Sequence, residues 1–234
     1  MRQIAITRAL SFFLEELWYT EAALAADPDA ADLAHAFDTT INEWDEVAQR
    51  ERLARRALVR ADAVVAVRNE HIDTETGRFA TLLKFEAGND TKGTFYKRFF
   101  TEAPSTFIGR NLRDQCEQTR DRIVPEIRKL PETSLLRPFA DRLIEFAKTA
   151  LAALTTRTKA RGENASVASD VADWKEGVNR LRTVTYAELL KRATEKKYGR
   201  DWVETFFRRD DSSAAVDDTP DEPTPPAPPA PQPR

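Results

Sequence analysis

The chain has 234 residues, enough for one sizeable domain or two small ones. Hydrophobic residues make up 41% and charged residues 32%, with only 7 glycines, which favours an all-helical protein because β-sandwiches need more turn residues. The formal net charge of −3 excludes a strongly basic nucleic-acid-binding protein, and the single cysteine excludes an internal disulfide. No apolar run approaches the roughly 18 residues of a membrane span, and no signal-peptide pattern opens the chain. We therefore expect a cytoplasmic protein with no membrane partner.

The first predicted helix covers residues 4–26. Its apolar side chains recur at steps of three and four, as on one face of a helix. Pro28 ends this helix because a proline pushes the preceding residue out of the α-helical region.

The longest predicted helix covers residues 29–73, a segment without internal glycine or proline after its start. One heptad seam runs through it without a break: Leu33, Phe37, Thr40, Trp44, Val47, Glu51, Ala54, Leu58, Ala61, Val65, Arg68 and Ile72. The two ends of this segment are apolar, whereas residues 49–56 are mostly charged. We therefore expect two packing zones, one against the first helix and one against the helices after Pro104, separated by a polar middle.

Residues 74–104 are predicted to form an irregular connection, because Gly77, Gly88, Gly93 and Pro104 interrupt them. The segment 88–94 superficially resembles a phosphate-binding loop. It lacks the lysine after the second glycine and the flanking strand and helix that such a loop needs, so it predicts a turn.

Three further helices are expected at about residues 106–129, 134–160 and 165–197, followed by a short amphipathic helix at 201–209. Ser105 is the predicted N-cap of the first of them. Pro125 is expected to loosen its last turns, and Gly162 is expected to separate the second helix from the third.

Residues 210–234 differ in composition from the rest of the chain. They hold six acidic residues against one arginine, followed by a proline-rich end: Asp210, Asp211, Asp217, Asp218, Asp221 and Glu222. With almost no large apolar side chain, this tail is predicted to be disordered. Its prolines suit either recognition by an aromatic-lined groove or a solubilising spacer.

Together these elements predict an all-α fold: an elongated, antiparallel, up-and-down bundle of about five helices plus a short C-terminal helix. The bundle occupies residues 1–209, and the disordered tail occupies 210–234. We find no repeat of 20 to 50 residues, which disfavours a solenoid.

Catalytic and metal-binding patterns are absent from the sequence. His35 and His71 are 36 positions apart on the long helix, about 54 Å by helical rise, so they cannot share a metal ion. Cys116 lies on the inward face of a predicted helix, where a free cysteine acts as a small hydrophobe. We predict no catalytic residue, no cofactor site and no metal site, and a protein that is not an enzyme.

The candidate interaction residues are basic or aromatic. They are Arg50, Arg52, Arg55, Arg56 and Arg60 in the polar middle of the long helix, and Tyr96, Lys97 and Arg98 in the irregular connection. If they converge on one face they can hold phosphates. Alternatively, the arginines pair with nearby acids such as Glu43, Asp45 and Glu46.

The sequence thus favours a non-enzymatic helical scaffold or interaction protein with a protein partner, self-associating through the helix at 29–73. The alternative is a nucleic-acid-associated protein that uses its arginine-rich helix faces. A carboxylate-based enzyme is the third hypothesis.

Overall fold

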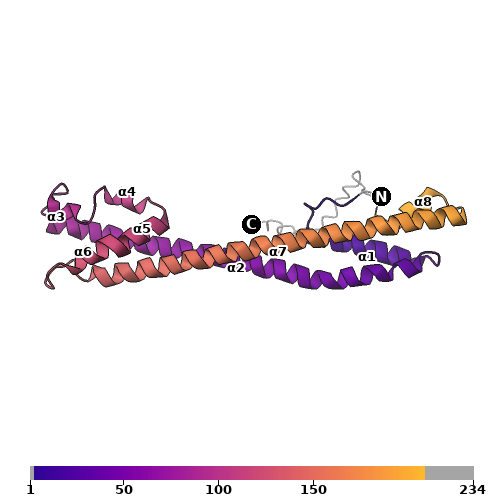
Figure 1. Ribbon diagram of the computed structural model, residues 1–234, viewed down its shortest axis with the longest axis horizontal. Helices are drawn as coiled ribbons and strands as arrows, with labels where there is room; N and C mark the ends of the chain where they lie inside the picture. The colour runs from indigo at the N-terminus through magenta and orange to yellow at the C-terminus, as the bar shows by residue number, and fades with distance from the viewer. Residues whose placement is uncertain (1–2, 209–234) are drawn as a thin grey trace, which may run out of the picture.

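The computed structural model describes residues 3–208, and within them the chain is helical without a strand. Two long antiparallel helices, α2 (His35–Glu86) and α7 (Phe139–Lys196), run side by side along the whole molecule (Figure 1). They have 52 and 58 residues, which corresponds to about 78 and 87 Å of helix. Shorter helices cover this pair at each end. The predicted all-α, elongated, antiparallel bundle is confirmed.

Lobe A is the end of the rod where α1 (Leu10–Ala26) and α8 (Arg200–Glu204) pack on the start of α2 and the end of α7 (Figure 1). The 3-10 turn η1 (Ala31–Leu33) joins α1 to α2. The core of lobe A is aromatic and aliphatic, with Phe13, Phe37, Leu189 and Phe206 almost fully buried. Polar contacts tie the end of α7 to the α1–α2 turn.

Those contacts centre on Asp29 and Asp32, which bind the last turns of α7. Arg192 donates to Asp32 at 2.5 Å and to the carbonyl of Asp29 at 2.9 Å. The Tyr198 hydroxyl donates to Asp29 at 2.6 Å, and Lys196 pairs with the same carboxylate. Hydrogen bonds from Lys196 and then Tyr198 hold the pKa of Asp29 below its usual value.

Lobe B, at the other end, is built by the end of α2, the start of α7 and a series of short helices (Figure 1). They are α3 (Thr94–Lys97), α4 (Pro104–Ile108), α5 (Leu112–Gln118), the π-helical turn η2 (Thr119–Ile123) and α6 (Val124–Arg128). Phe79 stands at the centre of its core and contacts the rings of Phe99, Phe100 and Phe139. The predicted packing of the N-terminal part of the long helix against the first helix is seen in lobe A, and Ile72 packs beside Cys116 of α5. The lobe B core itself uses α2 residues beyond the predicted helix, such as Phe79 and Leu83.

Both ends of the predicted helix 29–73 need correction. After η1, α2 begins at His35, and it continues past Asp73 to Glu86, so the first third of the predicted irregular connection is helical. Gly77 does not end the helix, because the neighbouring Phe79 and Leu83 stay on the buried face and anchor it. The helix ends instead at Gly88, whose φ is +62°. There a Schellman motif forms. The N–H of Gly88 donates to the carbonyl of Phe85 at 3.0 Å, and the N–H of Asn89 donates to the carbonyl of Lys84 at 2.9 Å.

The predicted break at Gly162 is wrong. Residues 139–196 form one uninterrupted helix, α7, with Gly162 and Gly177 inside it. A side chain at Gly162 would meet nothing within 4 Å, so this glycine faces open space. Buried Ala160 and Val171 on either side hold the helix against α2 and outweigh the low helix propensity of one glycine.

The predicted helices at 4–26 and 106–129 are also shorter than expected. The first begins at Leu10; before it, Ile4 is held on α7 by Asn179, and residues 5–8 form a turn closed by the N–H of Arg8 on the carbonyl of Ala5. The second is divided at Gly109 into α4 and α5, and its start at Pro104 makes Ser105 an internal residue rather than the N-cap. The loosening expected near Pro125 is confirmed, because the π-helical turn η2 lies directly before it.

No helix within residues 3–208 is both long and apolar enough to cross a bilayer. The predicted disordered tail at 210–234 lies outside the described residues.

Candidate interaction surface at the waist

The waist is the part of the rod between the lobes, where α2 and α7 pack mainly on each other: residues 49–67 of α2 and 153–170 of α7 (Figure 1). Ion pairs set the register of the two helices at its ends. Arg50 pairs with Asp170 at 3.3 Å at one end, and Asp62 lies 3.6 Å from Arg161 at the other. The buried residues of the waist are few: Ala61 and Val65 of α2 and Ala153, Leu154 and Ala160 of α7. The waist therefore buries little apolar surface on each helix.

The arginine cluster, defined as Arg52, Arg55, Arg56 and Arg60, lies on α2 within the waist. All four side chains are exposed, and none of them forms an ion pair with any residue in the described range. Arg50 differs, since it pairs with Asp170 and, at 3.9 Å, with Glu46. The alternative that nearby acids neutralise these arginines therefore holds for Arg50 alone. Like charges four positions apart on a helix destabilise it by roughly 0.2–0.5 kcal/mol per pair, so the cluster is unfavourable for the isolated chain.

A second feature of α2, which we call the outer stripe, is apolar and mostly exposed. Its apolar members are Leu53, Ala57, Val64, Val67, Leu82 and Phe85. They lie on one face beside the buried seam, because they follow one series of steps of three and four residues. The same series also contains Arg60, His71, Thr74 and Arg78. Exposure is 51% for Leu53, 47% for Val64, 53% for Val67 and 71% for Phe85. At its lobe B end, Leu82 and Phe85 line a shallow, mostly apolar hollow together with Arg78.

The seam predicted from the sequence, Leu33 to Ile72, does not include Val64 and Val67 of the outer stripe. The signal that could have found it is a second heptad spacing on the same helix, offset from the first by one residue. Only the structure shows that Leu53, Val64, Val67 and Phe85 on this face stay about half exposed or more, whereas His71 contacts Phe146 of α7 and Leu82 packs on the lobe B core.

The candidate residues of the connection, Tyr96, Lys97 and Arg98, lie in lobe B and do not join the arginine cluster (Figure 1). Tyr96 is buried in the lobe B core, and burial raises the pKa of its hydroxyl. Arg98 pairs with Glu126 at 2.8 Å, and Lys97 donates to the carbonyl of Thr101 at 3.4 Å. These three residues therefore take part in the packing of lobe B.

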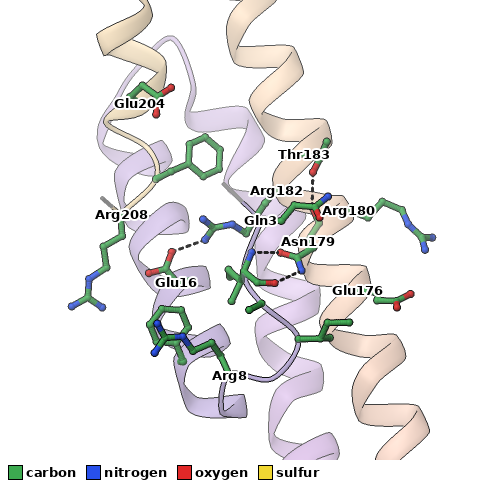
Figure 2. Close-up of a pocket in the computed structure, with 15 residues that line it drawn as sticks. Gln3, Arg8, Glu16, Glu176, Asn179, Arg180, Arg182, Thr183, Glu204 and Arg208 are labelled. Carbon is green, nitrogen blue, oxygen red and sulfur yellow. Dashed lines mark hydrogen bonds and ion pairs between the residues drawn. The ribbon is translucent and has the colours of Figure 1, made fainter. Parts of the chain in front are cut away.

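Lobe A contains a polar hollow of about 1000 Å³ between the N-terminal segment, α1, α7 and the residues after α8 (Figure 2). At its base the buried Arg182 donates to the buried Glu16 at 2.7 Å, and its guanidinium lies over the ring of Phe207. Asn179 accepts from the N–H of Ile4 at 2.9 Å and donates to its carbonyl at 2.8 Å. This buried, oppositely charged pair links α1 to α7, and removing one partner would leave an uncompensated buried charge.

The other buried carboxylate, Glu75, lies in lobe B and pairs with Arg142 at 3.0 Å. Within residues 3–208 the two buried carboxylates are thus in opposite lobes, each beside an arginine, and do not form the pair that acid–base catalysis needs. The Cys116 thiol is fully buried, and burial with the nearby Asp73 raises its pKa to about 12.

His35 is the first residue of α2, in lobe A, whereas His71 lies just beyond the lobe B end of the waist and contacts the ring of Phe146. Among residues 3–208, no group of three or more histidine, cysteine or acidic side chains is placed to hold a metal ion.

Comparisons of this chain with protein families, with curated proteins and with solved structures find no match. Its function is therefore argued from the waist and the lobes alone.

Proposed function

We propose that this chain is a non-enzymatic helical scaffold that associates with a second copy of itself through the outer stripe of α2. The observation that supports this most directly is the exposure of Leu53, Val64, Val67 and Phe85 along one face of a helix. Scattered exposed apolar residues are normal, whereas apolar side chains aligned on one helix face, here interrupted by Arg60 and by polar residues between Val67 and Leu82, are the pattern of a helix that packs against a partner. The two-helix waist leaves room for a second helical pair, because only one face of α2 is covered there.

The expected affinity is modest. Full burial of a Val, Leu or Phe side chain stabilises by about 1.5–3 kcal/mol, so covering the exposed half of each gives about 1 kcal/mol. Four such side chains in each of two copies give a gross gain of about 8 kcal/mol. Association costs about 4–15 kcal/mol in lost freedom, so this gain and the flanking contacts correspond to weak, reversible pairing. A scaffold that exchanges partners readily is consistent with that range.

Light scattering after gel filtration tests the proposal, because it reports mass independently of the rod shape that distorts elution volume. The expected result is a weight-average mass that rises from one chain toward two across a dilution series extending above tens of micromolar, where pairing this weak becomes populated. A mass that stays at one chain throughout the series would refute self-association.

A second candidate function is nucleic-acid association through the arginine cluster, favoured by the four exposed guanidinium groups without an ion pair in the described chain. Phosphate contacts of this kind weaken steeply with salt, by nearly one power of salt concentration per contact. Binding to duplex and single-stranded DNA measured across a salt series tests it. No affinity at low salt would remove this candidate.

We further propose that the scaffold works in the cytoplasm. Its support is the fully buried thiol of Cys116, since a free cysteine persists most readily where thiols are kept reduced. Locating a tagged full-length chain in its native cell tests this proposal, and secretion would contradict it.

A further inference from the structure

We propose that the acidic segment 210–222 of the same chain docks on the arginine cluster of α2. The arginine cluster is a surface without a partner in the described residues, and segment 210–222 lies outside them. The proposal goes beyond self-association, because it assigns a particular occupant to the charged part of the waist and does not require a second copy.

The charges of the two segments are complementary. Segment 210–222 has six acidic side chains and no basic one. The arginine cluster holds four cations within nine residues, about two and a half helical turns, and the neighbouring Arg50 adds a fifth that is already paired. Opposite charges this dense attract at low ionic strength, and the attraction weakens as salt screens it.

Several basic groups in lobe A compete poorly for this segment, because acids in the described chain already pair with them. Arg192 pairs with Asp32, Lys196 with Asp29, and Arg208, next to the segment itself, with Glu15 at 3.4 Å. The exposed Arg180, Lys191 and Lys197 form no ion pair within residues 3–208, but they are spread over eighteen residues at the end of α7 and do not form a dense cluster. The arginine cluster is the densest group of exposed cations without an ion pair in the described part of α2.

The chain is long enough to reach. Arg208 contacts Glu15 of α1. Leu10, five residues before Glu15 on the same helix, accepts a hydrogen bond at its carbonyl from Trp44 of α2 at 3.3 Å. Arg208 therefore lies opposite the first turns of α2. From there the arginine cluster lies about 20–30 Å along the rod. The fourteen residues from 209 to 222 span up to about 46 Å when extended. The acids can therefore lie across the cluster without disturbing lobe A.

Distance measurement in the full-length chain tests the docking. We would place a short-range donor–acceptor dye pair on Thr219→Cys and Ala63→Cys, since the buried Cys116 thiol does not compete for labelling. For an undocked chain, random-coil dimensions and helical rise give a separation of about 40 Å, whereas docking on the cluster shortens it to about 15 Å. The expected result is the short separation at low salt and a return toward the long one at high salt.

Two sets of substitutions make the result specific. Replacing Arg52, Arg55, Arg56 and Arg60 by Gln is expected to lengthen the separation to that of the undocked chain. The matched control replaces by Gln four exposed bases of lobe B and the adjoining part of α7 that likewise form no ion pair within residues 3–208, removing the same charge: Lys84, Lys92, Lys97 and Lys148. It is expected to leave the short separation unchanged.

Three outcomes would overturn the proposal. The first is a long separation in the unmodified chain at low salt, and the second is an equal effect of the control set. The third is a separation that lengthens when excess unlabelled chain is added, because the segment would then dock on a neighbouring molecule. None of these depends on self-association, which light scattering tests separately.

Discussion

The double substitution Val64→Gln/Val67→Gln is expected to abolish self-association without unfolding the chain. Both valines are about half exposed, 47% and 53%, so the folded single chain loses little when they are replaced. Glutamine keeps the net charge and is a good helix former, so neither the arginine cluster nor α2 is perturbed. In a pair of chains, by contrast, four apolar side chains would be lost from the interface.

The magnitude follows from the exposed areas. At about 1 kcal/mol for each half-exposed valine, losing four of them weakens the pair by about 4 kcal/mol, or close to a thousandfold in dissociation constant. Burying four amides without partners adds to this cost. Light scattering over a concentration series should therefore show one-chain mass for the variant at every concentration where the unmodified chain pairs.

The matched control is Val59→Gln/Val184→Gln. These valines are 61% and 64% exposed, and Val59 lies five positions from Val64, about 140° around α2 from the outer stripe. The control is expected to pair like the unmodified chain. The assignment of the interface to the outer stripe would be refuted if the stripe variant still pairs, or if the control weakens pairing to the same extent.

Three further predictions concern the fold. Gly162→Ala is expected to raise the free energy of unfolding by about 0.5–1 kcal/mol, because this helical glycine faces open space. Gly88→Ala is expected to lower the free energy of unfolding, because the φ of Gly88 is +62°. Thermal denaturation of the two variants measures both changes. Arg182→Met is expected to destabilise lobe A by about 3–5 kcal/mol, and adding Glu16→Leu should recover much of the loss, as measured by calorimetry. Since its pKa is raised to about 12, Cys116 is expected to stay a thiol at pH 9 and react with maleimide only after denaturation; rapid reaction of the native chain would contradict its burial.

Much of the architecture could be predicted from the sequence because packing periodicity extends over long segments. The heptad seam from Leu33 to Ile72 is unbroken, so the long helix and its packing against the first helix follow from spacing alone. The helix boundaries cannot be predicted in this way, because buried residues on both sides of a glycine can hold a helix together across it. Gly77 and Gly162 resemble breaks in the sequence, yet both lie inside helices anchored by buried residues on either side, whereas Gly88 is needed at a positive φ and does end α2.

The candidate site divides in the same way. Helical spacing alone keeps the arginine cluster off the seam, in the charged middle of α2, so its exposure is predictable from sequence. Tyr96 and Arg98 resemble the arginine cluster only in residue type, and residue type alone does not predict whether they are free to bind a partner. Which basic group meets an acid depends on tertiary contacts such as Arg98 with Glu126, and these have no signature in a single sequence. The exposure of the outer stripe depends on which helices pack against α2, and this is known only from the fold.

The arginine cluster and the outer stripe lie on the same stretch of α2, and this proximity connects the two proposals. Two copies paired through the stripe bring their clusters near one another, and at physiological salt charges are screened only beyond about 8 Å. The like-charge repulsion therefore opposes pairing unless the clusters are neutralised. If segment 210–222 docks on the cluster of its own chain, it removes that repulsion and favours self-association. Neutralising its six acids should then weaken pairing at low salt far more than at high salt, an effect opposite to that expected if the acidic segment competed for the stripe itself.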